Sequence, residues 1–114
     1  MSDPRLKQIK IKTGVLKRVG KEKLSYRKEA DQQKAKIEKM KEEGRDELEI
    51  KKMGEVLQET LMMIPDCHRR LVAAHAELSN IIETEAELNV EGEVEEFVAA
   101  QAQIKEAEEQ MKVE

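Results

Sequence analysis

The sequence has few aromatic residues and no long apolar run. Tryptophan is absent, and Tyr26 and Phe97 are the only tyrosine and phenylalanine among 114 residues, too few to anchor a deep globular core. The longest aliphatic run, Leu61–Ile64, is far shorter than the roughly 20 residues that span a bilayer. Cys67 is the only cysteine, which excludes an internal disulfide. The first residues also lack the apolar stretch of a signal peptide, so we expect a soluble cytoplasmic protein with no membrane partner.

Charged residues are abundant and unevenly distributed. They make up 40 % of the chain, and the net charge is −4. Residues 1–45 contain 15 Lys or Arg against 7 Asp or Glu, whereas residues 46–114 contain 6 against 18. A basic first segment lying beside acidic later ones adds little stability, because exposed ion pairs contribute only about 0–1 kcal/mol each. The charges instead select the register of the helices and the partners that bind.

Apolar residues recur with alternating spacings of three and four, which is the heptad pattern of helices packed along their length. The pattern is unbroken between residues 50 and 81, at Ile50, Met53, Leu57, Thr60, Ile64, Cys67, Leu71, Ala74, Leu78 and Ile81. An earlier segment repeats it at Ile9, Lys12, Leu16, Val19, Lys23, Tyr26, Ala30, Gln33, Ile37 and Met40. There we expect the lysine stems to be buried while their ammonium groups reach water. A weaker third pattern comprises Val90, Val94, Phe97, Gln101, Ile104, Glu108 and Met111.

Turn and cap residues divide these patterns into three helices of a single domain, residues 1–114. Asp3 and Pro4 suit a helix start, Gly44 suits a helix end, and Asp46 caps the next helix. Pro65 interrupts the second helix, but the heptad keeps its phase there, which predicts a kinked continuous helix rather than two. We predict helices at about 4–43, 46–82 and 88–111. Short connections make neighbouring helices antiparallel, so the fold class is all-α, an elongated antiparallel three-helix bundle.

The chain offers no convincing catalytic, cofactor or metal site. Residues 14–21 resemble a phosphate-binding loop only superficially, because the glycine spacing is wrong and Glu22 stands where Ser or Thr should follow. His68 and His75 are two helical turns apart, about 10 Å, which is too far to share a metal. We therefore expect a non-enzyme that works by binding.

Two features suggest a binding surface. Residues 5–28 contain ten Lys or Arg and one acid, Glu22, without the aromatic platforms that nucleic-acid binding uses. This basic run either faces the acidic helices or attracts an acidic protein partner, and binding to RNA or an anionic membrane is a competing hypothesis. Met62 and Met63 beside Pro65 suit an irregular partner, and the equally supported alternative is that both side chains fill the core of the bundle.

Several segments together resemble one family, the tubulin-binding cofactor A family. They are Asp3–Arg5, Gln8–Val15, Lys28–Ala30, Gln32–Gln33, Lys36–Met40, Met62–Cys67 and Arg69–Leu71. The resemblance implies a cytosolic chaperone that takes up β-tubulin released from the chaperonin. It then holds quasi-native β-tubulin and passes it to other tubulin-folding cofactors for assembly of the αβ heterodimer. It also implies a three-helix rod, no nucleotide cofactor, and a place beside the microtubule cytoskeleton. The family includes monomers and dimers, so monomer or homodimer stays open.

We predict that β-tubulin binds through charge steering and apolar contact. The candidate steering residues are Lys10, Lys17, Arg18, Lys21, Arg69 and Arg70. Met62 and Met63 are the candidates for apolar contact around a bend at Pro65. The alternative function is a coiled-coil scaffold or tether without a chaperone role.

Overall fold

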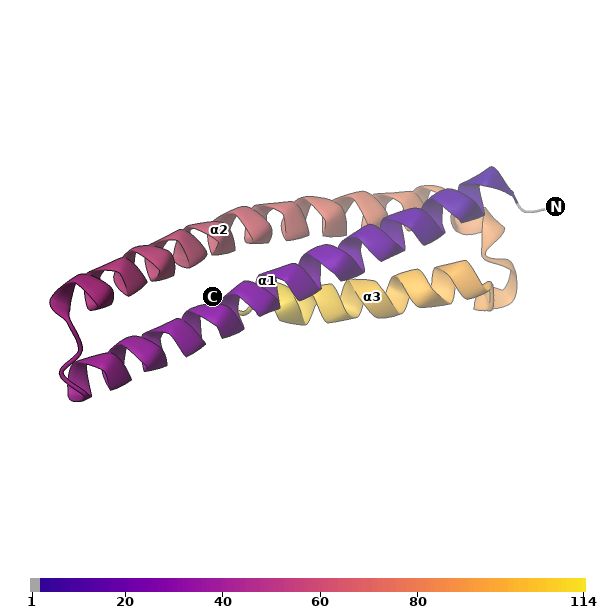
Figure 1. Ribbon diagram of the computed structural model, residues 1–114. Coiled ribbons are helices and arrows are strands. Elements are labelled where there is room, and N and C mark those ends of the chain that lie inside the picture. The colour runs from indigo at the N-terminus through magenta and orange to yellow at the C-terminus, as the bar shows by residue number, and fades with distance from the viewer. Residues whose placement is uncertain (1–2) are drawn as a thin grey trace.

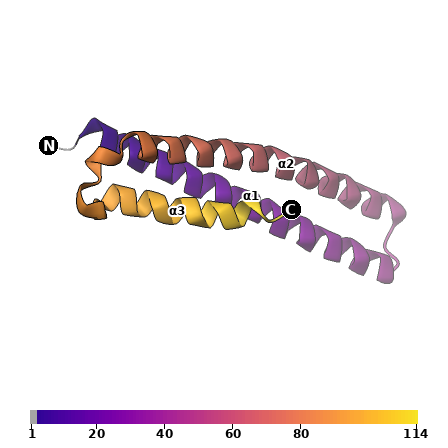
Figure 2. The same ribbon diagram turned by 180° about the vertical axis from the view of Figure 1, so that it is seen from behind.

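The computed structural model describes residues 3–114 and consists of three long helices with short connections. They are α1 (Pro4–Glu42), α2 (Glu47–Thr84) and α3 (Glu95–Met111), and two short 3₁₀ turns, η1 (Ala86–Leu88) and η2 (Val90–Gly92), lie between α2 and α3. Consecutive helices run antiparallel, and α1 and α2 lie side by side along the whole length (Figures 1 and 2). The molecule measures 64 × 24 × 17 Å, and its radius of gyration is 19.6 Å, against about 13 Å for a compact domain of this length. The predicted all-α, elongated three-helix fold is confirmed.

The ends of α1 and the start of α2 follow from the predicted cap residues. The Asp3 carboxylate accepts a hydrogen bond from the backbone N–H of Arg5 at 2.9 Å, and Pro4 occupies the first helical position. Gly44 has φ +67°, a left-handed conformation that ends the helix. Asp46 then accepts a hydrogen bond from the N–H of Leu48 at 3.2 Å and starts α2.

α2 continues without a break through Pro65. The prediction of one continuous helix, rather than two separate helices, is confirmed. The bend at Pro65 stays a prediction. The predicted heptad of α2 faces the interior: every member from Ile50 to Ile81 is buried or half-buried.

The predicted start of the third helix at about 88 is wrong, because α3 begins at Glu95. Glu91 and Gly92 have φ values of 57° and 72°, and a helix cannot pass through left-handed residues. The Asn89 side chain instead accepts a hydrogen bond from the N–H of Val94 at 3.2 Å and holds the chain just before the helix.

The predicted heptad of the third helix is also wrong in part. Gln101 and Glu108 are exposed. The buried side of α3 consists of Phe97, Ala100, Gln103, Ala107 and Gln110. The predicted pattern includes Val90 and Val94, which precede the helix. It does not include the small alanines, Ala100 and Ala107, through which α3 packs against α1 and α2.

The main core lies where all three helices overlap. Its buried members are Ile9, Leu16, Val19, Leu71, Leu78, Phe97, Ala100 and Ala107. With 17 residues, α3 is about 25 Å long, so it covers only part of the α1–α2 pair (Figure 1). The remainder, residues 24–63, is a hairpin of two helices, which we call the two-helix half.

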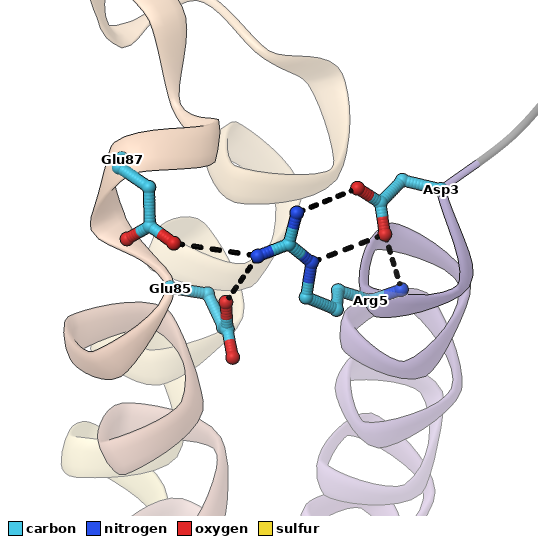
Figure 3. A network of polar contacts seen from close by, with 4 residues as sticks. All are labelled: Asp3, Arg5, Glu85 and Glu87. Carbon is cyan, nitrogen blue, oxygen red and sulfur yellow. Dashed lines mark hydrogen bonds and ion pairs between the residues drawn. The ribbon is translucent and has the colours of Figure 1, made fainter.

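An ion-pair network at the opposite end joins the start of α1 to the end of α2. The Arg5 guanidinium contacts Asp3 at 2.9 Å, Glu85 at 3.0 Å and Glu87 at 3.4 Å (Figure 3). Hydrogen bonding to Arg5 holds the pKa of Asp3 below its ordinary value. The network fixes the helix ends near the α2–α3 connection.

Candidate partner-binding surface

The four predicted cations of α1 are exposed. Lys10 lines a small hollow with Glu95, Glu96 and Ala99 of α3. Within residues 3–114, Lys17, Arg18 and Lys21 form no ion pair, and all three are exposed. This part of α1 therefore carries positive charge that is available to a partner.

The two predicted arginines of α2 are exposed but paired with acids of the same molecule. Arg69 lies 3.4 Å from Asp66, while Arg70 lies 3.1 Å from Glu22 of α1 and 3.4 Å from Asp66. The hydrogen bond to Glu22 raises the pKa of Arg70. These arginines therefore offer a partner less net charge than the cations of α1.

Met62 and Met63 border a hollow of about 460 Å³ in the two-helix half. We call it the methionine hollow, and its lining residues are Tyr26, Glu29, Glu59, Thr60, Met62 and Met63. Met62 is 72 % exposed and Met63 is 37 % exposed. The alternative in which both methionines fill the core of the bundle is therefore wrong.

Pro65 and Arg69 lie at a different hollow, which shares no residue with the first. This proline hollow, of about 530 Å³, is lined by Lys23, Ile64, Pro65, His68, Arg69 and residues 111–114. The structure thus places two predicted site residues of α2 at each hollow, and Arg70 lines neither of them.

Lys23 departs from the expectation that its ammonium reaches water. The side chain is 1 % exposed. Its Nζ donates to the carbonyl oxygen of Gln110 at 2.9 Å, to that of Val113, and to Nδ1 of His68 at 3.0 Å. Burial lowers the pKa of Lys23, and the nearby charge of Arg27 acts in the same direction. A cation at the carboxyl end of α3 suits the helix dipole, so Lys23 anchors this end of α3.

The remaining candidate groups have structural partners. Nε2 of His75 lies 3.1 Å from the Glu108 carboxylate of α3. Cys67 is fully buried, and burial raises the pKa of its thiol above the ordinary value of 9.0. Residues 3–114 contain no group of three or more His, Cys, Asp and Glu side chains placed to hold a metal ion. None of the helices that these residues form combines the length and apolar character that a bilayer crossing requires.

Comparison with known proteins shows the family. A sequence profile of the family described as Tubulin binding cofactor A matches residues 4–104. The chain belongs to the tubulin binding cofactor A family. Tubulin-specific chaperone A of Gallus gallus is 59 % identical over 102 residues, which are 90 % of this chain and 92 % of that protein.

Solved structures of tubulin binding cofactor A proteins share the fold. The structure of human tubulin chaperone cofactor A has a TM-score of 0.77 at 50 % identity and covers 92 % of this chain and 99 % of its own. The structure of tubulin folding cofactor A from Arabidopsis thaliana has a TM-score of 0.82 at 36 % identity, and the match covers 93 % of this chain and 97 % of that chain.

Sequence reasoning missed four lining residues of the methionine hollow as binding residues: Tyr26, Glu29, Glu59 and Thr60. The heptad repeat locates Glu29 opposite Met63 once the register between α1 and α2 is known from the Glu22–Arg70 pair. Glu29 follows Glu22 by seven residues, and Met63 precedes Arg70 by seven. Two positions seven residues from a known cross-helix pair are expected to face each other as well.

Proposed function

We propose that this protein is a tubulin-folding chaperone. It captures quasi-native β-tubulin released from the cytosolic chaperonin, holds it, and passes it to other tubulin-folding cofactors for assembly of the αβ heterodimer. It acts in the cytoplasm beside the microtubule cytoskeleton, by binding rather than by catalysis. The observation that carries this proposal is the match to the tubulin binding cofactor A family over residues 4–104, together with 59 % identity to a tubulin-specific chaperone A.

The shape of the molecule supports a holding role. A rod of 64 × 24 × 17 Å presents long sides to a client instead of an enclosing cavity. In the described part of the chain, residues 3–114, no third helix lies across the two-helix half, so more of α1 and α2 is open there (Figures 1 and 2). Such a side shields client surface that would otherwise bind α-tubulin, without enclosing the client.

The residues proposed to contact β-tubulin keep their predicted roles. Lys10, Lys17, Arg18 and Lys21 steer the acidic client toward α1, with smaller contributions from Arg69 and Arg70, which are paired internally. Met62 and Met63 supply exposed apolar surface. Pro65 and Arg69 belong to the neighbouring proline hollow.

The test is a binding experiment with separated subunits. Purified protein is mixed with β-tubulin freshly released from chaperonin, or with intact αβ heterodimer, and the complexes are separated by size-exclusion chromatography. We expect a complex that contains β-tubulin and no α-tubulin, identified by mass spectrometry. If β-tubulin elutes unbound while the chaperone is folded, the proposed function is wrong.

A further inference from the structure

Cross-helix ion pairs connect one side of α1 and α2. Lys12 pairs with Glu77 at 2.7 Å, and Glu22 pairs with Arg70 at 3.1 Å. The helices are antiparallel and repeat every seven residues, so the next position toward the α1–α2 turn brings Glu29 opposite Met63. Both residues do line the methionine hollow. In this second pair of positions, Met63 takes the place on α2 that Arg70 has in the pair with Glu22.

The two carboxylates at this hollow, Glu29 and Glu59, are not paired with a cation in the part of the chain that the structure describes. Among residues 3–114, neither Glu29 nor Glu59 forms an ion pair, and Glu29 only accepts a hydrogen bond from Nε2 of Gln33 at 3.3 Å. The remaining lining is the ring of Tyr26, the buried Thr60 and the two exposed methionines. The hollow thus combines an apolar wall with two negative charges.

This combination fits a long side chain that ends in a cation. The aliphatic stem of arginine or lysine packs against methionine, and a cation is attracted to an aromatic face and to carboxylates. A purely apolar side chain fits less well, because it would remove Glu29 and Glu59 from water without a partner for their charge. Charge complementarity therefore selects a basic side chain as the occupant.

We propose that the methionine hollow binds an arginine or lysine side chain of the tubulin client. This cation takes the position relative to Glu29 that Arg70 takes relative to Glu22. The inference rests on the proposed function and adds a second mode of contact to it: α1 steers acidic client surface with its cations, whereas the two-helix half grips a basic residue with carboxylates.

The test supplies the missing cation from within the chaperone. In the variant Met63→Arg, the new guanidinium pairs with Glu29 and fills the hollow, so affinity for β-tubulin falls by about tenfold. The double variant Glu29→Gln with Glu59→Gln keeps the shape of the hollow, removes both charges, and also weakens binding by about tenfold. Matched controls on the exposed side of α3, Val98→Arg and Glu106→Gln, leave the affinity unchanged.

Dissociation constants are measured by fluorescence titration with β-tubulin, and circular dichroism checks that each variant retains its helix content. If the wild-type protein does not bind β-tubulin, the proposed function and this inference both fail. If the wild-type protein binds while the double variant binds equally well, the inference alone is overturned. If Met63→Arg disturbs the fold, the affinity of the double variant still tests the inference.

Discussion

At the scale of single residues, the buried Lys23 of the first heptad links α1 to the end of α3. The ammonium of Lys23 meets the last carbonyl groups of α3, so one side chain of α1 fixes where the third helix ends. Lys12 belongs to the same heptad, but its ammonium pairs with Glu77 at the surface. Sequence reasoning treats these two lysines alike. Only the position of the end of α3 makes them different.

We predict that Lys23→Met lowers the free energy of unfolding by about 1–2 kcal/mol, because the carbonyl groups at the end of α3 lose a charged donor. Hydrogen exchange in the last turn of α3 should also become faster. Lys12→Met is the control and should cost less than about 1 kcal/mol, since it removes only a partly exposed ion pair. Equal stability of the two variants in urea titrations would contradict the anchoring role of Lys23.

Glycines in α1 differ in what their missing side chain permits. At Gly20, an added Cβ would lie 1.9 Å from Oε1 of Gln110, so this glycine leaves room for the end of the Gln110 side chain of α3. At Gly14, nothing lies within 4 Å of an added Cβ. The sequence alone does not distinguish the two positions, because the difference depends on which part of α1 faces Gln110.

Gly14→Ala should raise the free energy of unfolding by about 1 kcal/mol, because alanine favours the helix and meets no neighbour. Thermal denaturation measures the change. As a control, Gly44→Ala should lower stability by about 1 kcal/mol, since φ is +67° there. A Gly14→Ala protein that melts below the wild type would show that the position has a neighbour or a role that the structure does not contain.

At the scale of elements, α1 and α2 are predictable and α3 is not. The first two patterns are long and unbroken, so their buried faces follow directly from the spacing of Leu, Ile and Val. α3 begins after a connection with two left-handed residues, and its buried face uses Ala100 and Ala107, which carry little hydrophobic signal. The methionine hollow depends on the register between α1 and α2, which no single helical pattern contains.

The proline inside α2, Pro65, leads to a prediction about both stability and binding. An interior proline removes one backbone donor and costs up to about 3 kcal/mol. Pro65→Ala should therefore straighten and stabilise α2, which thermal denaturation detects. It should also weaken binding of β-tubulin, because Pro65 is exposed and lines the proline hollow. If the variant is more stable and binds with unchanged affinity, the proline has no part in recognition.

At the scale of the whole molecule, the rod presents different chemistry on different surfaces. Within residues 3–114, α1 carries exposed cations that form no ion pair, whereas the methionine hollow is bordered by carboxylates. The net charge of −4 conceals this division. A client that fits the rod is expected to match both surfaces, which favours one orientation of binding.

Reversing the charges of Lys17, Arg18 and Lys21 to glutamate should slow association with β-tubulin, because long-range attraction to the acidic client is lost. The difference from the wild type should be largest at low ionic strength and shrink as salt is added. Stopped-flow measurements over a salt series give the rates. Rates that match the wild type at every salt concentration would reject steering by α1.

The most direct test of the account asks which side of the rod touches the client. A photoreactive amino acid is placed at position 62, at the methionine hollow, or at position 98, on the exposed side of α3, and each protein is irradiated in complex with β-tubulin. The account predicts crosslinks to β-tubulin from position 62 and few or none from position 98. Crosslinks from position 98 alone would contradict the claim that the two-helix half holds the client.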